Sequence, residues 1–126
     1  GYALGSEELI GIMRKCSASW NLNVCAQKAA VAGLADQEYY QAQKAKIVEG
    51  REYLEKEMAA LGCKVYPSQS NFIYFDTGKD PAWIQEQLMD KGIRIGAFEM
   101  SRVSVGTMEE CKLYIKALKE ILKAAE

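Results

Sequence analysis

Apolar and polar residues follow two different spacings along the chain, and each spacing predicts a different element. Apolar residues three or four positions apart predict amphipathic helices, whereas alternation or a short apolar run predicts a strand. Helical spacing covers residues 7–15, 24–34, 37–61, 81 to about 91, and 108 to the end. Strand patterns cover residues 63–66, 72–75, 93–95 and 102–105. This order predicts one α+β domain, in two layers, with helices packed on a small three- to four-stranded sheet.

Residues typical of helix ends bracket these segments. Ser6, Asp36 and Asp80 are suitable N-caps, and Thr107-x-x-Glu110 forms a capping box before the last helix. Gly62, a typical C-cap residue, ends the long helix at 37–61. That helix carries one apolar stripe on a charged surface, formed by Tyr40, Ile47, Val48, Leu54, Met58 and Leu61.

The strand patterns differ in which faces they predict to be buried. The continuous apolar run 72–75 predicts a central strand covered on both faces. Segments 93–95 and 102–105 alternate, so Arg94 and Arg102 should face away from the core. Trp20, the large aromatic of an irregular loop, is expected to fill a core position.

Composition narrows the class of protein. The chain has 126 residues, of which 49% are hydrophobic, and 16 Lys and Arg balance 17 Asp and Glu. Such a chain is long enough for a core of its own, and its near-neutral charge offers no basic face to nucleic acid or an anionic membrane. Neither an apolar run long enough for a membrane span nor a leader pattern occurs, so a cytoplasmic protein is expected.

Histidine is absent, which excludes nucleophile systems that use imidazole and zinc sites that require it. The four cysteines lack the spacing of a metal clip, and we expect reduced, mostly buried thiols. No phosphate-binding glycine loop, dinucleotide fingerprint or calcium loop occurs, so no metal or cofactor site is expected on this chain.

Arg102 is the outstanding polar residue, because it lies in a strand of otherwise β-branched and serine residues. Its guanidinium group either forms a salt bridge at the rim or binds a carboxylate with its planar donor fork. Asn71, at the start of a strand, either orients a ligand or makes a local hydrogen bond. The residues alone leave both alternatives open.

Five segments, in this order, resemble the C-terminal part of histidinol-phosphate aminotransferases. They are residues 1–5 (Gly-Tyr-Ala-Leu-Gly), 20–23 (Trp-Asn-Leu-Asn), 26–27 (Ala-Gln), 66–72 (Tyr-Pro-Ser-Gln-Ser-Asn-Phe) and 102–107 (Arg-Val-Ser-Val-Gly-Thr). These enzymes belong to the fold-type I transferases that depend on pyridoxal phosphate (PLP). The resemblance implies the small domain of that architecture, and a reaction that moves an amino group between an amino acid and a 2-oxo acid.

The resemblance also implies roles for individual residues. Arg102 corresponds to the arginine that binds the substrate α-carboxylate, and Asn71 should lie near the substrate entrance. Asn21 and Asn23 should lie in a loop that borders the active site. The lysine that binds PLP would precede Gly1, so no catalytic residue is expected here and the chain alone should be inactive. The complete enzyme is expected to be a homodimer.

One departure concerns the substrate. The family often has an arginine for the substrate phosphate where this chain has Gly96, and Arg94 is displaced from that position by two residues. Recognition of histidinol phosphate is therefore in question. Within the single domain 1–126, we expect residues 1–5 to end a strand of the large domain, 6–35 to connect, and 36–126 to form the small domain.

Two readings without catalysis remain open. The chain could be a stand-alone α+β module whose strand arginines bind a carboxylate ligand or a protein partner. It could also be a pure interaction protein, since helix 24–34 is rich in small residues.

Overall fold

The computed structural model describes residues 3–18 and 21–125, which divide into two compact units, Gly1–Tyr40 and Gln41–Glu126. Its elements are α1 (Glu7–Lys15), α2 (Val24–Ala35), α3 (Gln37–Ala60), β1 (Lys64–Tyr66), β2 (Phe72–Asp76), α4 (Pro81–Met89), β3 (Gly96–Ala97), β4 (Ser101–Ser104) and α5 (Met108–Ala124). Gly1, Tyr2 and Trp20 lie outside the described residues. The expected long helix at 37–61 is confirmed as α3.

The first unit contains α1, α2 and the start of α3, and local capping defines where its helices begin. Ser6 Oγ accepts a hydrogen bond from the Leu9 amide at 3.3 Å, as the sequence predicts. Asp36 caps α3 by accepting from the Tyr39 amide at 3.2 Å. No residue of α1 or α2 is buried. Their apolar side chains are exposed, namely Leu9, Ile12, Met13, Val24, Val31 and Leu34.

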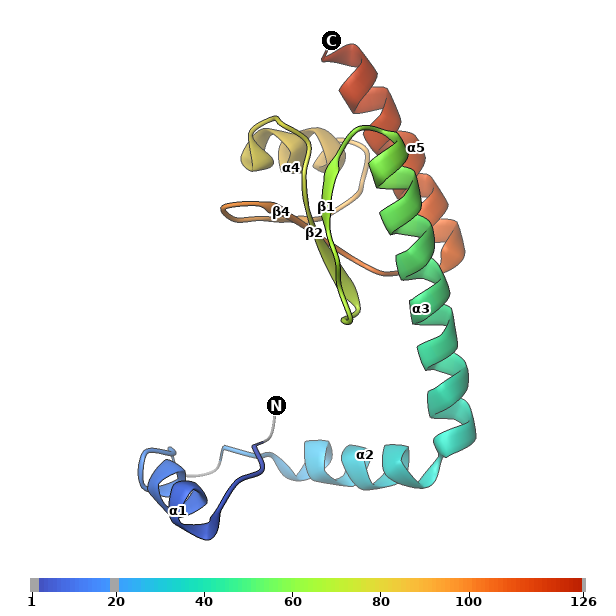
Figure 1. The fold of residues 1–126 in the computed structure, drawn as a ribbon. Helices are drawn as coiled ribbons and strands as arrows, with labels where there is room; N and C mark the ends of the chain where they lie inside the picture. Colours follow the sequence, from blue (N-terminus) through green and yellow to red (C-terminus); the bar gives the residue numbers. More distant parts are fainter. Residues whose placement is uncertain (1–2, 19–20, 126) are drawn as a thin grey trace. The chain divides into compact units, whose positions relative to one another are not determined.

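The second unit is built on a four-stranded antiparallel sheet in the order β1-β2-β4-β3 (Figure 1). In β2, Phe72 and Tyr74 pair with Ser104 and Arg102 of β4. Arg102 also pairs with Gly96 of β3 on its other side. The expected α+β class and the size of the sheet are both confirmed.

The predicted strand at 93–95 is wrong, because pairing begins only at Gly96. The backbone of this segment bonds to α4 instead of to a strand. The Ile93 amide donates to the Leu88 carbonyl at 2.9 Å, and Gln85 Nε2 donates to the Ile95 carbonyl at 2.7 Å. These two bonds use groups that a sheet ladder would need.

One face of the sheet packs against α3, α4 and α5. Ile73 and Phe75 of β2 are fully buried in a single core with Val103 of β4. The opposite face carries Phe72 and Tyr74, which are only half-buried. Within this unit, the expectation that run 72–75 is covered on both faces is therefore wrong.

The helices of the second unit supply the rest of the core. The buried residues of α3 are Gly50, Leu54 and Met58, those of α4 are Ile84 and Leu88, and those of α5 are Cys111, Tyr114, Ile115, Ala117, Leu118 and Ile121. Only the second half of the predicted stripe on α3 is buried, since Tyr40 is 59% exposed. α3 ends, as predicted, before Gly62, which adopts a positive φ of 81°.

All four cysteines are free thiols. Cys63 and Cys111 are buried, whereas Cys16 and Cys25 are exposed, so the expectation of mostly buried thiols holds for half of them. In the described residues, no group of three metal-ligating side chains comes together. None of the helices described is both long and apolar enough to cross a membrane.

Candidate functional site

Arg102 occupies the centre of the sheet face that the helices leave open. Its strand, β4, is an inner strand, so the backbone of Arg102 is held on both sides, by Tyr74 and by Gly96. Val103 next to it points into the core, which fixes Arg102 on the opposite face because side chains alternate along a strand. The side chain is half-buried.

Two aromatic rings flank the guanidinium group. Its Cζ lies 5.4 Å from the ring centroid of Phe72 and 5.1 Å from that of Phe98. Both distances are typical of cation–π contacts. Among the described residues, no carboxylate lies within ion-pair distance of Arg102, so the salt bridge considered from the sequence is not formed there. The donor fork is therefore available to an external anion.

A cavity of about 450 Å³ opens beside this guanidinium group. Its lining residues come from α4, the segment after it, and the β3–β4 hairpin: Gln85, Arg94, Ile95, Gly96, Ala97, Phe98, Arg102 and Ser104. Two arginines line it, and neither an acidic residue nor a lysine does. Uncompensated positive charge favours a carboxylate or a phosphate in this cavity.

The lining residues of this cavity also show whether PLP could attach here. The sequence resemblance implies this cofactor for the complete enzyme. A Schiff base with PLP requires a lysine amine at the site. Because the cavity beside Arg102 contains no lysine, these residues do not fit covalent attachment of that group. Their positive charge fits an anionic group of a ligand instead.

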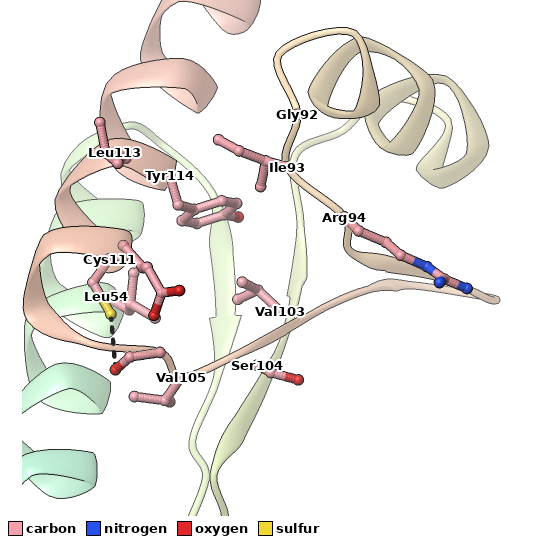
Figure 2. Close-up of a pocket in the computed structure, with 12 residues that line it drawn as sticks. Leu54, Gly92, Ile93, Arg94, Val103, Ser104, Val105, Cys111, Leu113 and Tyr114 are labelled. Carbon is pink, nitrogen blue, oxygen red and sulfur yellow. Dashed lines mark hydrogen bonds between the residues drawn. The ribbon is translucent and has the colours of Figure 1, made fainter.

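Arg94 lies five residues after the end of α4 and outside any strand. Its side chain is exposed and lines the cavity beside Arg102 as well as a second cavity of about 360 Å³. Figure 2 shows this second cavity, in which Arg94 extends away from Tyr114 and Cys111. The structure thus brings Arg94 and Arg102 to one cavity.

The second cavity is apolar at its base. Leu54, Cys111 and Tyr114 are buried there, and Cys111 Sγ lies 3.8 Å from the Gly106 carbonyl (Figure 2). Burial raises the pKa of the Cys111 thiol above its ordinary value, so the thiol stays protonated. A buried neutral thiol is a poor nucleophile.

Asn71 lies just before β2 and does not line the cavity beside Arg102. Its backbone carbonyl accepts from the Val105 amide at 2.8 Å, and its Oδ1 accepts from Ser70 Oγ at 3.2 Å. Both are local hydrogen bonds at the start of the strand. Its side chain is exposed.

Asn21 and Asn23 belong to the first unit, which is described separately from the unit that contains Arg102. Asn23 is the N-cap of α2, and its Oδ1 accepts from the Ala26 amide at 2.7 Å. Asn21 is exposed.

Sequence reasoning missed the aromatic partners of Arg102. The sequence pattern predicts that Phe72 belongs to a buried strand and that Phe98 lies in a connection without a role. A signal for Phe72 existed, because an antiparallel pairing of 72–75 with 102–105 puts it diagonally across from Arg102. Nothing local indicates the contact with Phe98, which depends on how the hairpin turns.

Comparison with known proteins defines the class. Residues 1–118 match the family model "Aminotransferase class I and II", and the chain therefore belongs to that family. The histidinol-phosphate aminotransferase of Moorella thermoacetica is 33% identical over 128 residues, which cover 97% of this chain and 33% of that protein. That of Citrifermentans bemidjiense is 35% identical and covers 96% of this chain and 37% of that protein. The chain thus spans about a third of the length of these curated relatives.

Solved structures agree on the architecture. Histidinol-phosphate aminotransferase from Sinorhizobium meliloti, solved with pyridoxal-5'-phosphate, matches with a TM-score of 0.74 and 30% identity, over 91% of this chain and 34% of that one. A decarboxylase from Sulfurospirillum multivorans has the same TM-score of 0.74 at 18% identity, over 94% of this chain and 38% of that one. The second match concerns the fold alone. The chain therefore has the fold of the matching part of a fold-type I aminotransferase.

Proposed function

We propose that this chain forms the substrate-carboxylate site of a PLP-dependent aminotransferase, which moves an amino group between an amino acid and a 2-oxo acid. The observation that carries the proposal is Arg102, a guanidinium group without a carboxylate partner in the described residues, held on an inner strand beside a cavity of about 450 Å³. Its planar fork can donate hydrogen bonds to both oxygens of a carboxylate at once.

The strand holds Arg102 rigidly, and this rigidity is what would make the residue useful in catalysis. A carboxylate bound to a rigid fork fixes the position of the adjacent α-carbon, which lowers the entropic cost of reaching the reactive geometry. Arg94 supplies a second positive charge to the same cavity. From the sequence resemblance, we also propose that Asn71 borders the substrate entrance of the complete enzyme, and that Asn21 and Asn23 belong to the loop beside its active site.

The amino donor is the finer part of the proposal. Relatives named histidinol-phosphate aminotransferase support a phosphate-bearing donor. Gly96 stands where the family often has an arginine for that phosphate, and this absence supports a donor without phosphate. Both classes of donor share the amino-group transfer, so the test below is run with histidinol phosphate and with unphosphorylated amino acids as donors.

We place PLP and the lysine that binds it in the part of the complete enzyme outside this chain. PLP supplies an electron sink for the α-carbon when it is bound. Because the cavity beside Arg102 has no lysine, we propose that this chain alone does not transaminate. We further propose that the complete enzyme is a cytoplasmic homodimer whose small-molecule partners are an amino acid and a 2-oxo acid.

The test is Arg102→Lys in the complete protein. Lysine keeps the charge but loses the bidentate fork, so kcat/KM should fall about tenfold to a thousandfold, or ~1.4–4 kcal/mol. Arg51→Lys is the matched control, because Arg51 lies on α3 and donates to the Ser70 carbonyl at 3.3 Å, away from the cavity. An unchanged kcat/KM in Arg102→Lys, with every donor tried, would refute the assignment.

A further inference from the structure

Phe98 is a large apolar side chain at the tip of the β3–β4 hairpin, and the proposed reaction gives it no role. Its side chain is 60% exposed, although phenylalanine side chains are usually buried. The turn is tight, since the Phe98 amide donates to the Met100 carbonyl at 3.1 Å. Although Phe98 is exposed, its ring lies 5.1 Å from the Cζ of Arg102.

Gly96 makes this position of the ring possible. A Cβ atom on Gly96 would lie 2.8 Å from Phe98 Cε2 and 3.5 Å from Arg102 Nε. Any other residue at position 96 would therefore force the ring to shift, which would disturb its contact with the guanidinium group. The absence of a side chain at position 96 and the contact between Phe98 and Arg102 are parts of one arrangement.

The second ring is held by its neighbours on the sheet. Phe72 lies 5.4 Å from the Cζ of Arg102 and packs edge-to-face against Tyr74, with centroids 5.6 Å apart and planes at 85°. The guanidinium group thus contacts one ring from the central strand and one from the hairpin. Rings bind the face of a guanidinium group and leave its N–H edge for hydrogen bonds.

We propose that Phe98 is a positioning residue for Arg102, and that Gly96 is required for it. The two rings hold the guanidinium plane before a ligand arrives, so that its fork is presented to the carboxylate. A free arginine side chain has several rotatable bonds, and ordering it on binding weakens affinity. This inference rests on the proposed function, because it assumes that the anion of Arg102 is the substrate carboxylate.

Steady-state kinetics of the complete protein distinguish positioning from a merely structural role. Phe98→Leu removes the ring, and KM for the amino donor should rise about fivefold to tenfold while kcat stays within about twofold. Phe98→Tyr keeps the ring and should behave like the native protein. Equal KM values for the leucine and native proteins would overturn the proposal.

A double-mutant cycle tests the link to Gly96. Gly96→Ala should raise KM to the same extent as Phe98→Leu, because it acts by displacing the ring. Combining the two should therefore add little, since the second change removes a contact that is already lost. If the two effects on KM multiply fully, Gly96 does not act through Phe98, and this part of the proposal is wrong.

A measurement on the 126-residue chain does not depend on the reaction. The NMR signal of the Arg102 Nε–H group should show restricted motion and a ring-current shift, with Arg51 and Arg94 as internal references. Phe98→Leu should remove both features, and Phe98→Tyr should retain them. Identical signals in the leucine and native chains would overturn the positioning role. Because this readout needs no turnover, it stays informative even if Arg102→Lys refutes the proposed function.

Discussion

Gly50, in the middle of α3, lies against Val105 at the end of the strand that carries Arg102. A Cβ atom on Gly50 would stand 2.8 Å from Val105 Cγ1 and 3.5 Å from Cys111 Sγ. Gly50 is buried, so this close approach is part of the core. It connects α3, the exit of β4 and the first turn of α5 at one point.

The contact predicts an unusual result for a glycine in a helix. Alanine normally stabilises a helix interior by about 1 kcal/mol relative to glycine. Here Gly50→Ala should instead destabilise the protein by about 1–2 kcal/mol, because overpacking of a core costs about 1–3 kcal/mol. Urea unfolding at neutral pH measures the change. Val105→Ala removes the clashing methyl groups, so the alanine at position 50 should cost less in that background; an equal cost would rule out this clash.

The capping box of α5 predicts a second change in stability. Thr107 Oγ1 accepts from the Glu110 amide at 3.3 Å, and Glu110 Oε2 accepts from the Thr107 amide at 2.7 Å. Thr107→Ala should lower the free energy of unfolding by about 1 kcal/mol, since the first turn of α5 loses its cap. Ser104→Ala, at an exposed strand position, serves as the control and should change little. An equal loss in both variants would contradict the role of the cap.

The same box predicts a pH dependence. Its hydrogen bonds from Thr107 hold the pKa of Glu110 below its ordinary value of 4.5. The folded state therefore favours the ionised form, and this stabilisation is complete above about pH 4.5 and is lost as pH falls through the folded pKa. The free energy of unfolding of the native chain should exceed that of Glu110→Gln by more at pH 6 than at pH 3. If the difference in free energy of unfolding between the two proteins is the same at both pH values, this linkage is wrong.

The four thiols should react in two classes. Burial, with the nearby Asp76 carboxylate, raises the pKa of Cys63 from 9.0 to about 11, and burial also raises that of Cys111. Cys16 and Cys25 are exposed. With a disulfide reagent at pH 8, we expect two fast equivalents and two that are at least about tenfold slower, because the thiolate is the reactive form. Cys63→Ser and Cys111→Ser should each remove one slow equivalent; four equal rates would contradict the buried positions.

Replacing Tyr114 by phenylalanine should have a small effect on the free energy of unfolding at neutral pH and a larger one in alkali. Its hydroxyl is buried and donates only to the weak acceptor Met58 Sδ, at 3.5 Å. Tyr114→Phe should therefore change the free energy of unfolding by no more than about 1 kcal/mol. Tyr114→Ala should cost about 3–5 kcal/mol by opening a cavity in the core.

Burial also raises the pKa of Tyr114 well above its ordinary value of 10.0. The protonated form is favoured in the folded state, so this contribution is complete below pH 10 and is lost as pH rises further. The stability of the native chain should fall relative to Tyr114→Phe between pH 9 and pH 11. Parallel denaturation curves for the two proteins over this range would contradict the buried hydroxyl.

The amino-acid sequence by itself determined the elements whose causes are local. Ser6 and the pair Thr107 and Glu110 place the starts of α1 and α5, because a capping side chain bonds to an amide two or three residues away. The alternation in 102–105 likewise put Arg102 on the face opposite the core. These features need no information about distant parts of the chain.

The tertiary structure decided what depends on distant partners. Segment 93–95 has the pattern of a strand, but its backbone bonds to α4, and no local signal encodes that choice. The run 72–75 is apolar throughout, yet helices cover only one of its faces in this unit. Phe98 meets Arg102 because the hairpin turns back over Gly96. Spacing along a sequence fixes which residues share a face, whereas contact between two faces depends on how the chain folds back on itself.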